Sequence, residues 1–337
     1  MNRAAQTSAV NIQAIAEAAG VSKTTVSHVL SGKRPVAAAT KERVLKIMEE
    51  FGYRPNFFAQ ALVTQRSQTI ALITQDITNP FYPSVARGVQ QAATEGGRIV
   101  MLFDLGIDPA RLRGFVDLAT QRRIDGVIAA ANGLDAAMLG TLESAGIPVV
   151  SIGPMPAGVA VDWVSADDQA IVEDAVRYLH AKGHERIGFI GGVSTVMPGS
   201  GRRQGYRRAM QALGLRSPPA LQIDGNWARD GAAAATGRML DLPSPPTAIV
   251  CANDIMAIGA LDAAFARGLS VPGDLAIVGV DDIDAASLVR PSLTTVRIPA
   301  EEIGRAAAML LLRRLSDRQG PRQHISIPHA LVARDSA

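Results

Sequence analysis

From Thr69 onward the chain repeats one pattern, in which a short apolar run is followed by an amphipathic helical segment. The apolar runs lie at 69–74, 98–103, 126–131, 147–152, 186–191, 221–225, 247–252 and 275–280. The helical segments lie at 81–95, 109–122, 135–145, 168–182, 200–213, 229–240 and 254–267. Strands buried on both faces read as continuous apolar runs, and an intervening helix makes the next strand parallel. The pattern therefore predicts an α/β core of doubly wound parallel sheets.

A length of 337 residues exceeds one ordinary hydrophobic core, so we expect the repeat to form two α/β lobes. Open α/β sheets bind small ligands at the carboxyl ends of their strands. Polar side chains follow the predicted strand ends at Asp76, Asn79, Asn132, Asn253, Asp254, Asp281 and Asp282. Arg202 and Arg203 add charge at the start of a predicted helix. The sequence therefore predicts a polar ligand in a cleft between the lobes.

The N-terminal segment shows helical periodicity and no strand. Gly20 ends a first helix and Ser22 caps a second, and Phe51 continues the apolar spacing of a third. Apolar residues with helical spacing define these three helices at 12–19, 23–30 and 38–50. Two short helices joined by a tight glycine turn match the helix-turn-helix pattern, whose second helix enters the major groove of DNA. A small helical cap with a solvated face is the alternative interpretation.

The second of these helices has a polar face opposite a thin apolar stripe. The stripe consists of Val26, Val29 and Leu30. Thr24 and His28 point the other way, with Lys23 and Ser27 on the flank.

Residues 1–66 carry nine Lys and Arg against four Glu, a net charge of +5, which leaves −2 for the rest of the chain. A basic segment on a near-neutral body indicates a polyanionic partner.

Residues 53–68 are unusually apolar for a linker. Pro55 ends the third helix, and Asn56 can cap a short helix that runs to about Val63. About eight residues are too few for a stable isolated helix in water, so we expect this segment to become ordered only when it binds a partner. A linker whose phenylalanines pack on the core is the alternative.

The sequence lacks the signatures of the common enzyme classes. The glycines at 188–192 do not form a dinucleotide fingerprint, and neither a phosphate loop nor a nucleophile elbow is present. The five His residues have no metal-ligand spacing. Carboxylates at the strand ends are therefore expected to hydrogen-bond a ligand rather than to perform acid–base chemistry. We predict a protein that is not an enzyme and uses no cofactor or metal; an α/β enzyme with an unrecognised site is the alternative.

The sequence also indicates the compartment. No apolar stretch reaches the roughly 18 residues that span a membrane, and the N-terminus has no secretory pattern. The single Cys251 cannot form an internal disulfide. We therefore expect a cytoplasmic protein. An exported binding protein of the periplasmic type is the less favoured alternative, because it would need an export signal and has no use for residues 11–63.

Several fragments, taken in order, resemble the LacI/GalR family of bacterial transcription regulators. They include "IQAIAEAAGVSKTTVSHVLSG", "GYRPNFFAQAL", "TNPFY", "IGFIGG", "CANDIMAIGAL", "VGVDD", "PSLTTV" and "LVARDS". The resemblance implies a headpiece at 1–54, a hinge helix and linker at 55–66, and a two-lobed core at 67–337. Within the core it implies lobe 1 at about 67–165 and 297–325, and lobe 2 at about 166–294 and 326–337.

The resemblance further implies a homodimer on a pseudo-palindromic, double-stranded operator. Lys23, Thr24 and His28 occupy the positions of base-reading side chains, and Thr25 and Ser27 occupy positions that touch phosphate or support the helix. The hinge helix is matched by Asn56, Ala59 and Leu62. Of these, Leu62 matches the leucine that wedges into the minor groove.

The resemblance also implies an effector site in the core. The matching positions are Phe81, Tyr82, Arg202, Trp227, Asn253 and Asp281. A ring face combined with directional polar groups suits a sugar, whereas Phe81 as a core residue and Trp227 at a domain edge are the alternatives. Gly153 and Ile298 replace polar residues of sugar-responsive members, and Phe57 replaces a common basic residue. We expect a repressor controlled by a small polar metabolite, a sugar or sugar derivative, and a dimer, because no leucine-heptad tail follows the core.

Overall fold

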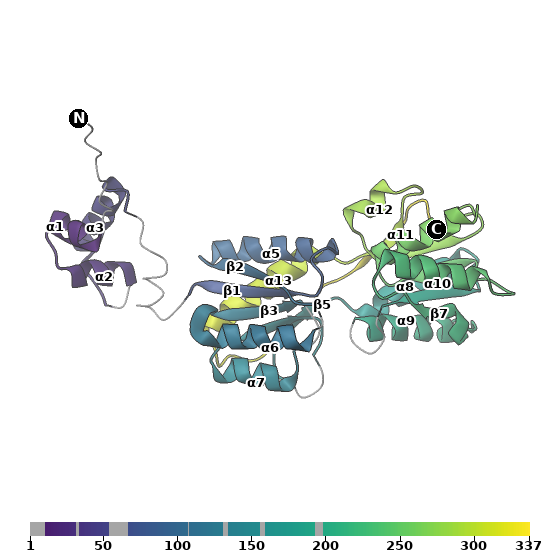
Figure 1. Ribbon diagram of the computed structural model, residues 1–337, viewed down its shortest axis with the longest axis horizontal. Helices are drawn as coiled ribbons and strands as arrows, with labels where there is room; N and C mark the ends of the chain where they lie inside the picture. The colour runs from purple at the N-terminus through teal and green to yellow at the C-terminus, as the bar shows by residue number, and fades with distance from the viewer. Residues whose placement is uncertain are drawn as a thin grey trace. The chain divides into compact units, whose positions relative to one another are not determined.

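The computed structural model describes residues 11–31, 34–53, 67–106, 108–130, 134–155, 159–192 and 198–337. The chain forms two compact units, Met1–Gln68 and Thr69–Ala337. In the described residues the first unit is entirely helical and the second is α/β (Figure 1). Both the helix-turn-helix unit and the doubly wound core agree with the prediction from the sequence.

Three helices make up the N-terminal unit. They are α1 (Ile12–Ala19), α2 (Lys23–Ser31) and α3 (Ala38–Glu50). Ser22 caps α2 as predicted, because its hydroxyl accepts a hydrogen bond of 3.1 Å from the N–H of Thr25. Gly20 ends α1 with a left-handed φ of +63°, which directs its N–H back to the carbonyls of the last turn. This is the tight turn that a helix-turn-helix requires.

The core of this unit is small. Its buried residues are Ile15, Ala16, Ala19, Val26, Val44 and Met48. Val29 and Leu30 are half-buried against this cluster, so the stripe of α2 holds that helix to its neighbours. The helix α3 ends at Glu50, as predicted, and the side chain of the capping residue Phe51, which continues the apolar spacing, is 43% exposed.

Lobe 1 of the core is built on one parallel sheet. Its strands are β1 (Thr69–Thr74), β2 (Ile99–Asp104), β3 (Gly126–Ala130), β4 (Val149–Ile152), β5 (Asp162–Ser165) and β11 (His324–Ser326). They lie in the order β11-β5-β4-β3-β1-β2, and neighbouring strands are parallel. The central strand β1 is buried at every position, which explains its continuous apolar run.

Lobe 2 repeats this topology. Its strands are β6 (Ile187–Gly191), β7 (Gln222–Asp224), β8 (Ala248–Cys251), β9 (Ala276–Asp281), β10 (Thr294–Arg297) and β12 (Ala330–Val332). They lie in the order β12-β10-β9-β8-β6-β7. The one difference in direction is at the edge, where β12 runs antiparallel to β10.

Helices cover both faces of each sheet (Figure 1). In lobe 1, α5 (Phe81–Glu95) and α13 (Ala300–Ser316) cover one face, and α6 (Pro109–Leu118) and α7 (Ala136–Ser144) cover the other. A π-helical turn, Ala119–Arg123, extends α6. In lobe 2 the pairs are α8 (Asp168–Ala181) with α9 (Gly199–Ala212), and α10 (Arg229–Leu240) with α11 (Asp254–Ala266).

Two glycines allow α5 and α13 to approach each other closely. A Cβ atom on Gly88 would lie 1.9 Å from the carbonyl oxygen of Glu301, and one on Gly304 would lie 2.1 Å from that of Val85. Backbone therefore meets backbone where the helices cross, and no larger residue fits at either position. The contact fixes α13, which comes late in the chain, onto the first helix of lobe 1.

The chain passes between the lobes three times, after β5, after β10 and after β11. Several elements of the core, most of them next to these passages, were not assigned from the sequence. They are β5, β10, β11, β12, α12 (Asp284–Leu288) and α13. The strands among them have only three or four residues, too few to show a period of two.

No helix in the described part of the chain is both long and apolar enough to cross a bilayer.

Candidate functional site

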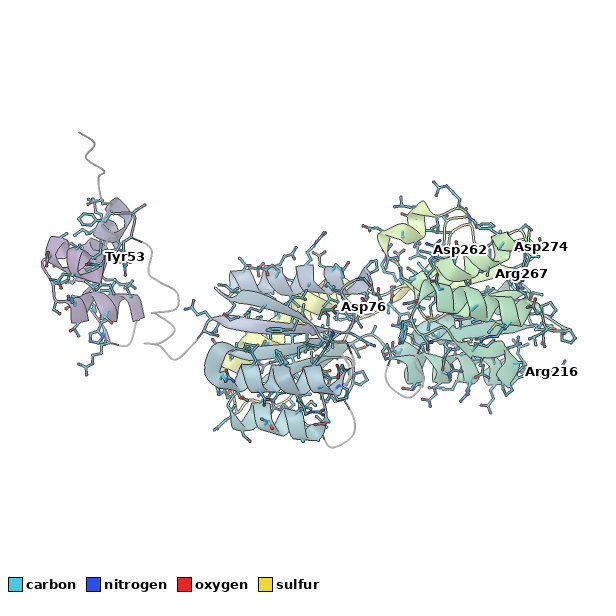
Figure 2. The ribbon with its side chains drawn as sticks, viewed as in Figure 1. Tyr53, Asp76, Arg216, Asp262, Arg267 and Asp274 are labelled. Atoms are coloured by element: carbon cyan, nitrogen blue, oxygen red, sulfur yellow. The ribbon has the colours of Figure 1, made fainter. Side chains whose placement is uncertain are left out.

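A cavity of about 230 Å³ lies where the carboxyl ends of the two sheets face each other. Its lining is Gln75, Asp76, Asn79, Phe81, Tyr82, Gly106, Pro198, Arg202, Asn226, Trp227, Asn253 and Asp281. All six effector residues predicted from the sequence line this cavity. Asp76, labelled in Figure 2, lies just beyond the end of β1.

Arg202 is the buried centre of the cavity. It lies in the first turn of α9, and its guanidinium donates to Asp168 from Nε at 2.9 Å and to the carbonyl oxygen of Ala252 from Nη1. Its Nη1 also lies 3.8 Å from the carboxylate of Asp281. These contacts hold the guanidinium in place and leave N–H donors for a ligand. Asp168, which the sequence analysis missed, is signalled only as an acidic residue at a helix start.

Asp281 ends β9 in an unusual backbone conformation. Asp281 and Asp282 both have positive φ values, +116° and +60°, a region that non-glycine residues rarely occupy and that often marks a functional site. Burial raises the pKa of the Asp281 carboxyl to about 7, with Arg202 opposing and Asp168 adding to the shift. The side chain of Asp282 turns away from the cavity and pairs with Arg297 and Arg334.

Asn253 offers a free donor. Its Oδ1 caps α11 by accepting from the N–H of Met256 at 2.8 Å, whereas its Nδ2 is buried and has no hydrogen-bond partner in the described structure. Buried polar groups are nearly always paired, so this donor is suited to bind a ligand. The neighbouring Asp254 does not line the cavity: it accepts from the hydroxyl of Thr295 at 2.6 Å and from the N–H of Ile283, and burial raises its pKa well above the usual range.

Aromatic rings complete the cavity. The rings of Phe81 and Tyr82 meet edge to face at 5.6 Å, and burial raises the pKa of the Tyr82 hydroxyl, which stays protonated. The Trp227 ring lies 5.7 Å from the Arg202 guanidinium and rests on Gly192, where a Cβ atom would be 1.9 Å from the ring. Trp227 therefore belongs to the cavity and is not a domain-edge residue.

A smaller cavity of about 80 Å³ adjoins the first and is mainly apolar. Its lining is Phe81, Tyr82, Ala130, Ile152, Gly153, Pro154, Ser165, Ala166, Asp168, Pro198, Arg202, Ile298 and Ile303. Gly153 and Ile298, where the sequence departs from sugar-responsive regulators, both lie here.

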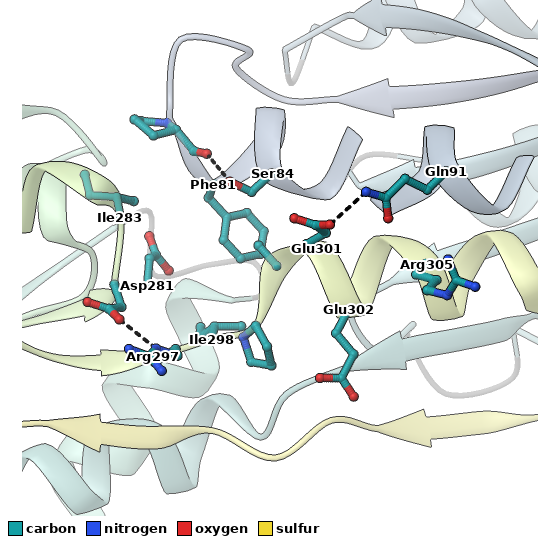
Figure 3. Close-up of a pocket in the computed structure, with 14 residues that line it drawn as sticks. Phe81, Ser84, Gln91, Asp281, Ile283, Arg297, Ile298, Glu301, Glu302 and Arg305 are labelled. Atoms are coloured by element: carbon teal, nitrogen blue, oxygen red, sulfur yellow. Dashed lines mark hydrogen bonds and ion pairs between the residues drawn. The ribbon is translucent and has the colours of Figure 1, made fainter. Parts of the chain in front are cut away.

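A larger cavity, about 500 Å³, lies where β10 passes into α13, and Figure 3 shows its lining. Of the six predicted effector residues, it includes only Phe81 and Asp281. Most of its charged groups are already paired, since Gln91 donates to Glu301, Arg297 pairs with Asp282, and Arg305 pairs with Glu95. The cleft differs in the described structure, because it contains the buried, unpaired donor of Asn253.

Other predicted residues lie elsewhere. Arg203 pairs with Asp224 and lies over the Phe189 ring, so it is not part of the cavity lining. On α2, Lys23 and Thr24 are exposed, Ser27 and His28 are half-buried, and Thr25 bonds Ser22. Three predicted hinge residues and one predicted cleft residue lie outside the described residues: Asn56, Ala59, Leu62 and Asn132. Sequence reasoning missed Gln75, Gly106, Pro198 and Asn226, which line the cavity but carry no sequence signal of their own.

Comparison with known proteins agrees with both units. Residues 11–56 match the model of bacterial regulatory proteins of the lacI family, and residues 176–337 match the periplasmic binding protein-like domain. The HTH-type transcriptional repressor CytR of Escherichia coli (strain K12) is 35% identical over 310 residues, which cover 91% of this chain and 90% of that protein.

Solved structures agree as well. A complex of the transcriptional regulator CelR with cellobiose is 31% identical, covers 97% of this chain and 100% of that chain, and has a TM-score of 0.75. The lac repressor dimer bound to operator and the anti-inducer ONPF is 26% identical, covers 97% and 98%, and has a TM-score of 0.84. These relatives are transcription regulators and not enzymes, as the sequence predicted. The chain belongs to the lacI family of bacterial regulatory proteins.

Proposed function

We propose that this chain is a sequence-specific repressor that binds a pseudo-palindromic operator as a homodimer. Its affinity for the operator falls or rises when a sugar or sugar derivative binds the cleft. One observation carries the proposal: a helix-turn-helix unit with an uncommitted polar face belongs to the same chain as a cleft with a buried, unpartnered donor at Asn253. Similar proteins support it, since one was solved with cellobiose and another as a dimer on its operator.

In this proposal α2 reads DNA. Lys23, Thr24 and His28 contact base edges in the major groove, while Thr25 and Ser27 touch phosphate or support the helix. The residues Asn56, Ala59 and Leu62 form the hinge helix, and Leu62 wedges into the minor groove at the operator centre. The headpiece extends over 1–54, the hinge over 55–66 and the core over 67–337.

The cleft suits a polyol. Hydroxyls donate to the Asp281 carboxylate and accept from Asn253 Nδ2 and the Arg202 guanidinium, and charge-assisted hydrogen bonds of this kind are the strong ones. The Trp227 ring supplies an apolar face for the C–H side of a sugar. Ligand binding changes the angle between lobe 1 and lobe 2, which are joined by three passages of the chain, and so changes the spacing of the two hinge helices in the dimer.

The edge of lobe 1 supports the dimer. The edge strand β2 exposes Ile99, Met101 and Leu102, which are 50%, 45% and 44% exposed. An exposed apolar edge strand is normally covered, because its free backbone groups and side chains favour pairing with another chain. A second copy of this chain is the occupant that we propose.

Fluorescence anisotropy with duplex DNA from the region upstream of the chain's own gene tests DNA binding. The expected result is saturable binding that a sugar or sugar derivative shifts roughly 5–150-fold, the range of ordinary allosteric coupling. Sequence-independent binding, or binding that no such compound changes, contradicts the proposal. For the dimer, Leu102→Lys should give monomers in sedimentation, whereas Gln222→Lys on the corresponding edge strand β7 should not.

A further inference from the structure

The interlobe cleft has two halves of different chemistry, and this division narrows the class of ligand. The polar half is the cavity of about 230 Å³ that contains Asn253 and Asp281, and the apolar half is the cavity of about 80 Å³ beside it. Four residues line both halves: Phe81, Tyr82, Pro198 and Arg202. Because they are shared, one ligand can occupy both halves at once.

The polar half contains the groups that hydroxyls need. Among the described residues, Asn253 Nδ2 is a buried donor without a partner and the Asp281 carboxylate accepts no hydrogen bond, although Arg202 Nη1 lies 3.8 Å from it. Arg202 itself donates to only two partners in the described structure. A donor and an acceptor that line the same cavity can together bind the hydroxyls of one sugar ring.

The apolar half offers little to a hydroxyl. Ile152, Ile298 and Ile303 form its walls with Ala130 and Ala166. Its polar side chains in the described structure are the Asp168 carboxylate and the Arg202 guanidinium, which are paired with each other, and the hydroxyls of Tyr82 and Ser165. A hydroxyl placed against the isoleucines would be desolvated without a partner, whereas an apolar group there removes hydrocarbon surface from water.

We propose that the effector is a sugar joined to a flat apolar ring, with the sugar in the polar half and the ring in the apolar half. Nucleosides and aryl glycosides share this chemistry. The proposal rests on the sugar-responsive function proposed above and goes beyond it, since it predicts that the bare sugar is the poorer ligand. Ile298 and Gly153, which replace polar residues of sugar-responsive relatives, then act as specificity residues.

Calorimetry on the full-length chain with matched pairs of compounds tests this. Ribose is compared with adenosine and uridine, and glucose is compared with phenyl β-D-glucoside. We expect the substituted compound of at least one pair to bind at least ten-fold more tightly than its free sugar. The pair that shows this increase in affinity tells whether the effector is a nucleoside or an aryl glycoside. Equal or weaker binding of the substituted compounds overturns this inference alone. Absence of binding by every compound overturns the sugar-responsive function, and this inference with it, whereas operator binding is measured separately.

Two matched variants test whether the apolar ring of the ligand lies in the apolar half of the cleft. Ile298→Ser places a hydroxyl in the apolar half and should reduce the ratio of substituted-compound to free-sugar affinity about ten-fold. Ile283→Ser is the control, because Ile283 is equally buried, 8% exposed against 5%, but does not line the apolar half. A ratio that Ile298→Ser leaves unchanged, or that Ile283→Ser lowers as much, contradicts the placement of the ring.

Discussion

Each lobe of the core buries an arginine against aspartate, but the two groups are built differently. In lobe 1, Arg314 uses all five N–H donors: two bind the Asp162 carboxylate at 2.8 and 3.0 Å, and three bind carbonyls of the turn after α13. In lobe 2, Arg202 makes two hydrogen bonds and approaches Asp281 only to 3.8 Å. The saturated group holds the fold together, and the unsaturated group keeps donors for a ligand.

The titration of the two carboxyls expresses the same difference. Burial alone would raise the pKa of Asp162, but hydrogen bonds from Arg314 and from the N–H of Gln323 outweigh it and lower that pKa. At Asp281 burial prevails over Arg202, and the pKa rises to about 7. A carboxyl that is fully bonded stays charged, whereas one that awaits a partner is close to taking up a proton.

The largest expected effect is on stability, in lobe 1. Arg314→Ala leaves the Asp162 carboxylate buried without its partner and removes three bonds that shape the turn, so unfolding in urea should show a loss of about 3–5 kcal/mol. Arg322→Ala is the control: Arg322 is 32% exposed and approaches Glu143 and Asp162 at only 3.4 and 3.8 Å, and its loss should cost under about 1 kcal/mol. Equal losses of stability from the two substitutions would contradict the view that the Arg314 group holds lobe 1 together.

The second prediction concerns ligand binding, in lobe 2. Arg202→Ala should raise the concentration of effector needed to change operator affinity by ten-fold or more, about 1.5–3 kcal/mol, because a charge-assisted hydrogen bond to the ligand is lost. Its cost in stability should be smaller than that of Arg314→Ala, since Asp281 can become neutral. Arg208→Ala, on an exposed part of the same helix, serves as the control. An unchanged effector response would contradict the role of Arg202.

The third prediction is a difference in pH dependence. Because the pKa of Asp281 is raised in the folded state, its contribution to the free energy of unfolding is present below pH 4 and is lost as pH rises to about 7. Asp281→Asn should therefore lose less stability between pH 5 and pH 8 than the unaltered chain, by up to about 1.4 kcal/mol per pH unit below the pKa. Asp162 acts in the opposite sense, with its contribution lost only in acid. Identical slopes for variant and unaltered chain would show that Asp281 does not titrate in this window.

The smallest effect is expected for the two tryptophans. Trp227→Leu removes the ring near the Arg202 guanidinium and should weaken effector binding by about 0.5–1 kcal/mol. Trp163→Leu removes a ring stacked on His324 at 4.6 Å in lobe 1 and should lower stability but leave effector affinity unchanged. If Trp163→Leu weakened effector binding as much as Trp227→Leu does, the assignment of effector binding to Trp227 and of a purely structural role to Trp163 would be wrong.

The parts of the fold that could be predicted are those with a long periodic signal. Every apolar run of six residues from Thr69 to Val280 corresponds to a strand, and α5 and α10 were predicted with their observed bounds. The short strands β10, β11 and β12 were not, because they are defined by pairing with strands far away in the sequence. Contacts of that kind leave no local trace.

Most residues that line the cleft could be predicted from the sequence, but their hydrogen bonding could not. Strand-end position placed Asn253 and Asp281 at the cleft, whereas the same argument wrongly included Asp254 and Asp282, which are bound to Thr295 and to two arginines. A one-residue difference decides which way a side chain points at a strand end. Nothing local to Arg202 indicates that it is incompletely bonded, because its partners come from three other segments of the chain.

The three passages between the lobes have a consequence for synthesis. The ribosome delivers β1 to β5 first, yet α13, which covers one face of their sheet, and β11, which completes its edge, come from the last part of the chain, as the yellow helix in lobe 1 of Figure 1 shows. A chain that stops before Ala300 has its DNA-reading unit but an uncovered apolar sheet, and such intermediates are prone to aggregation. Neither lobe is complete until β11 and β12 have been made, so synthesis interrupted before them should supply few regulators that hold DNA but cannot sense a ligand.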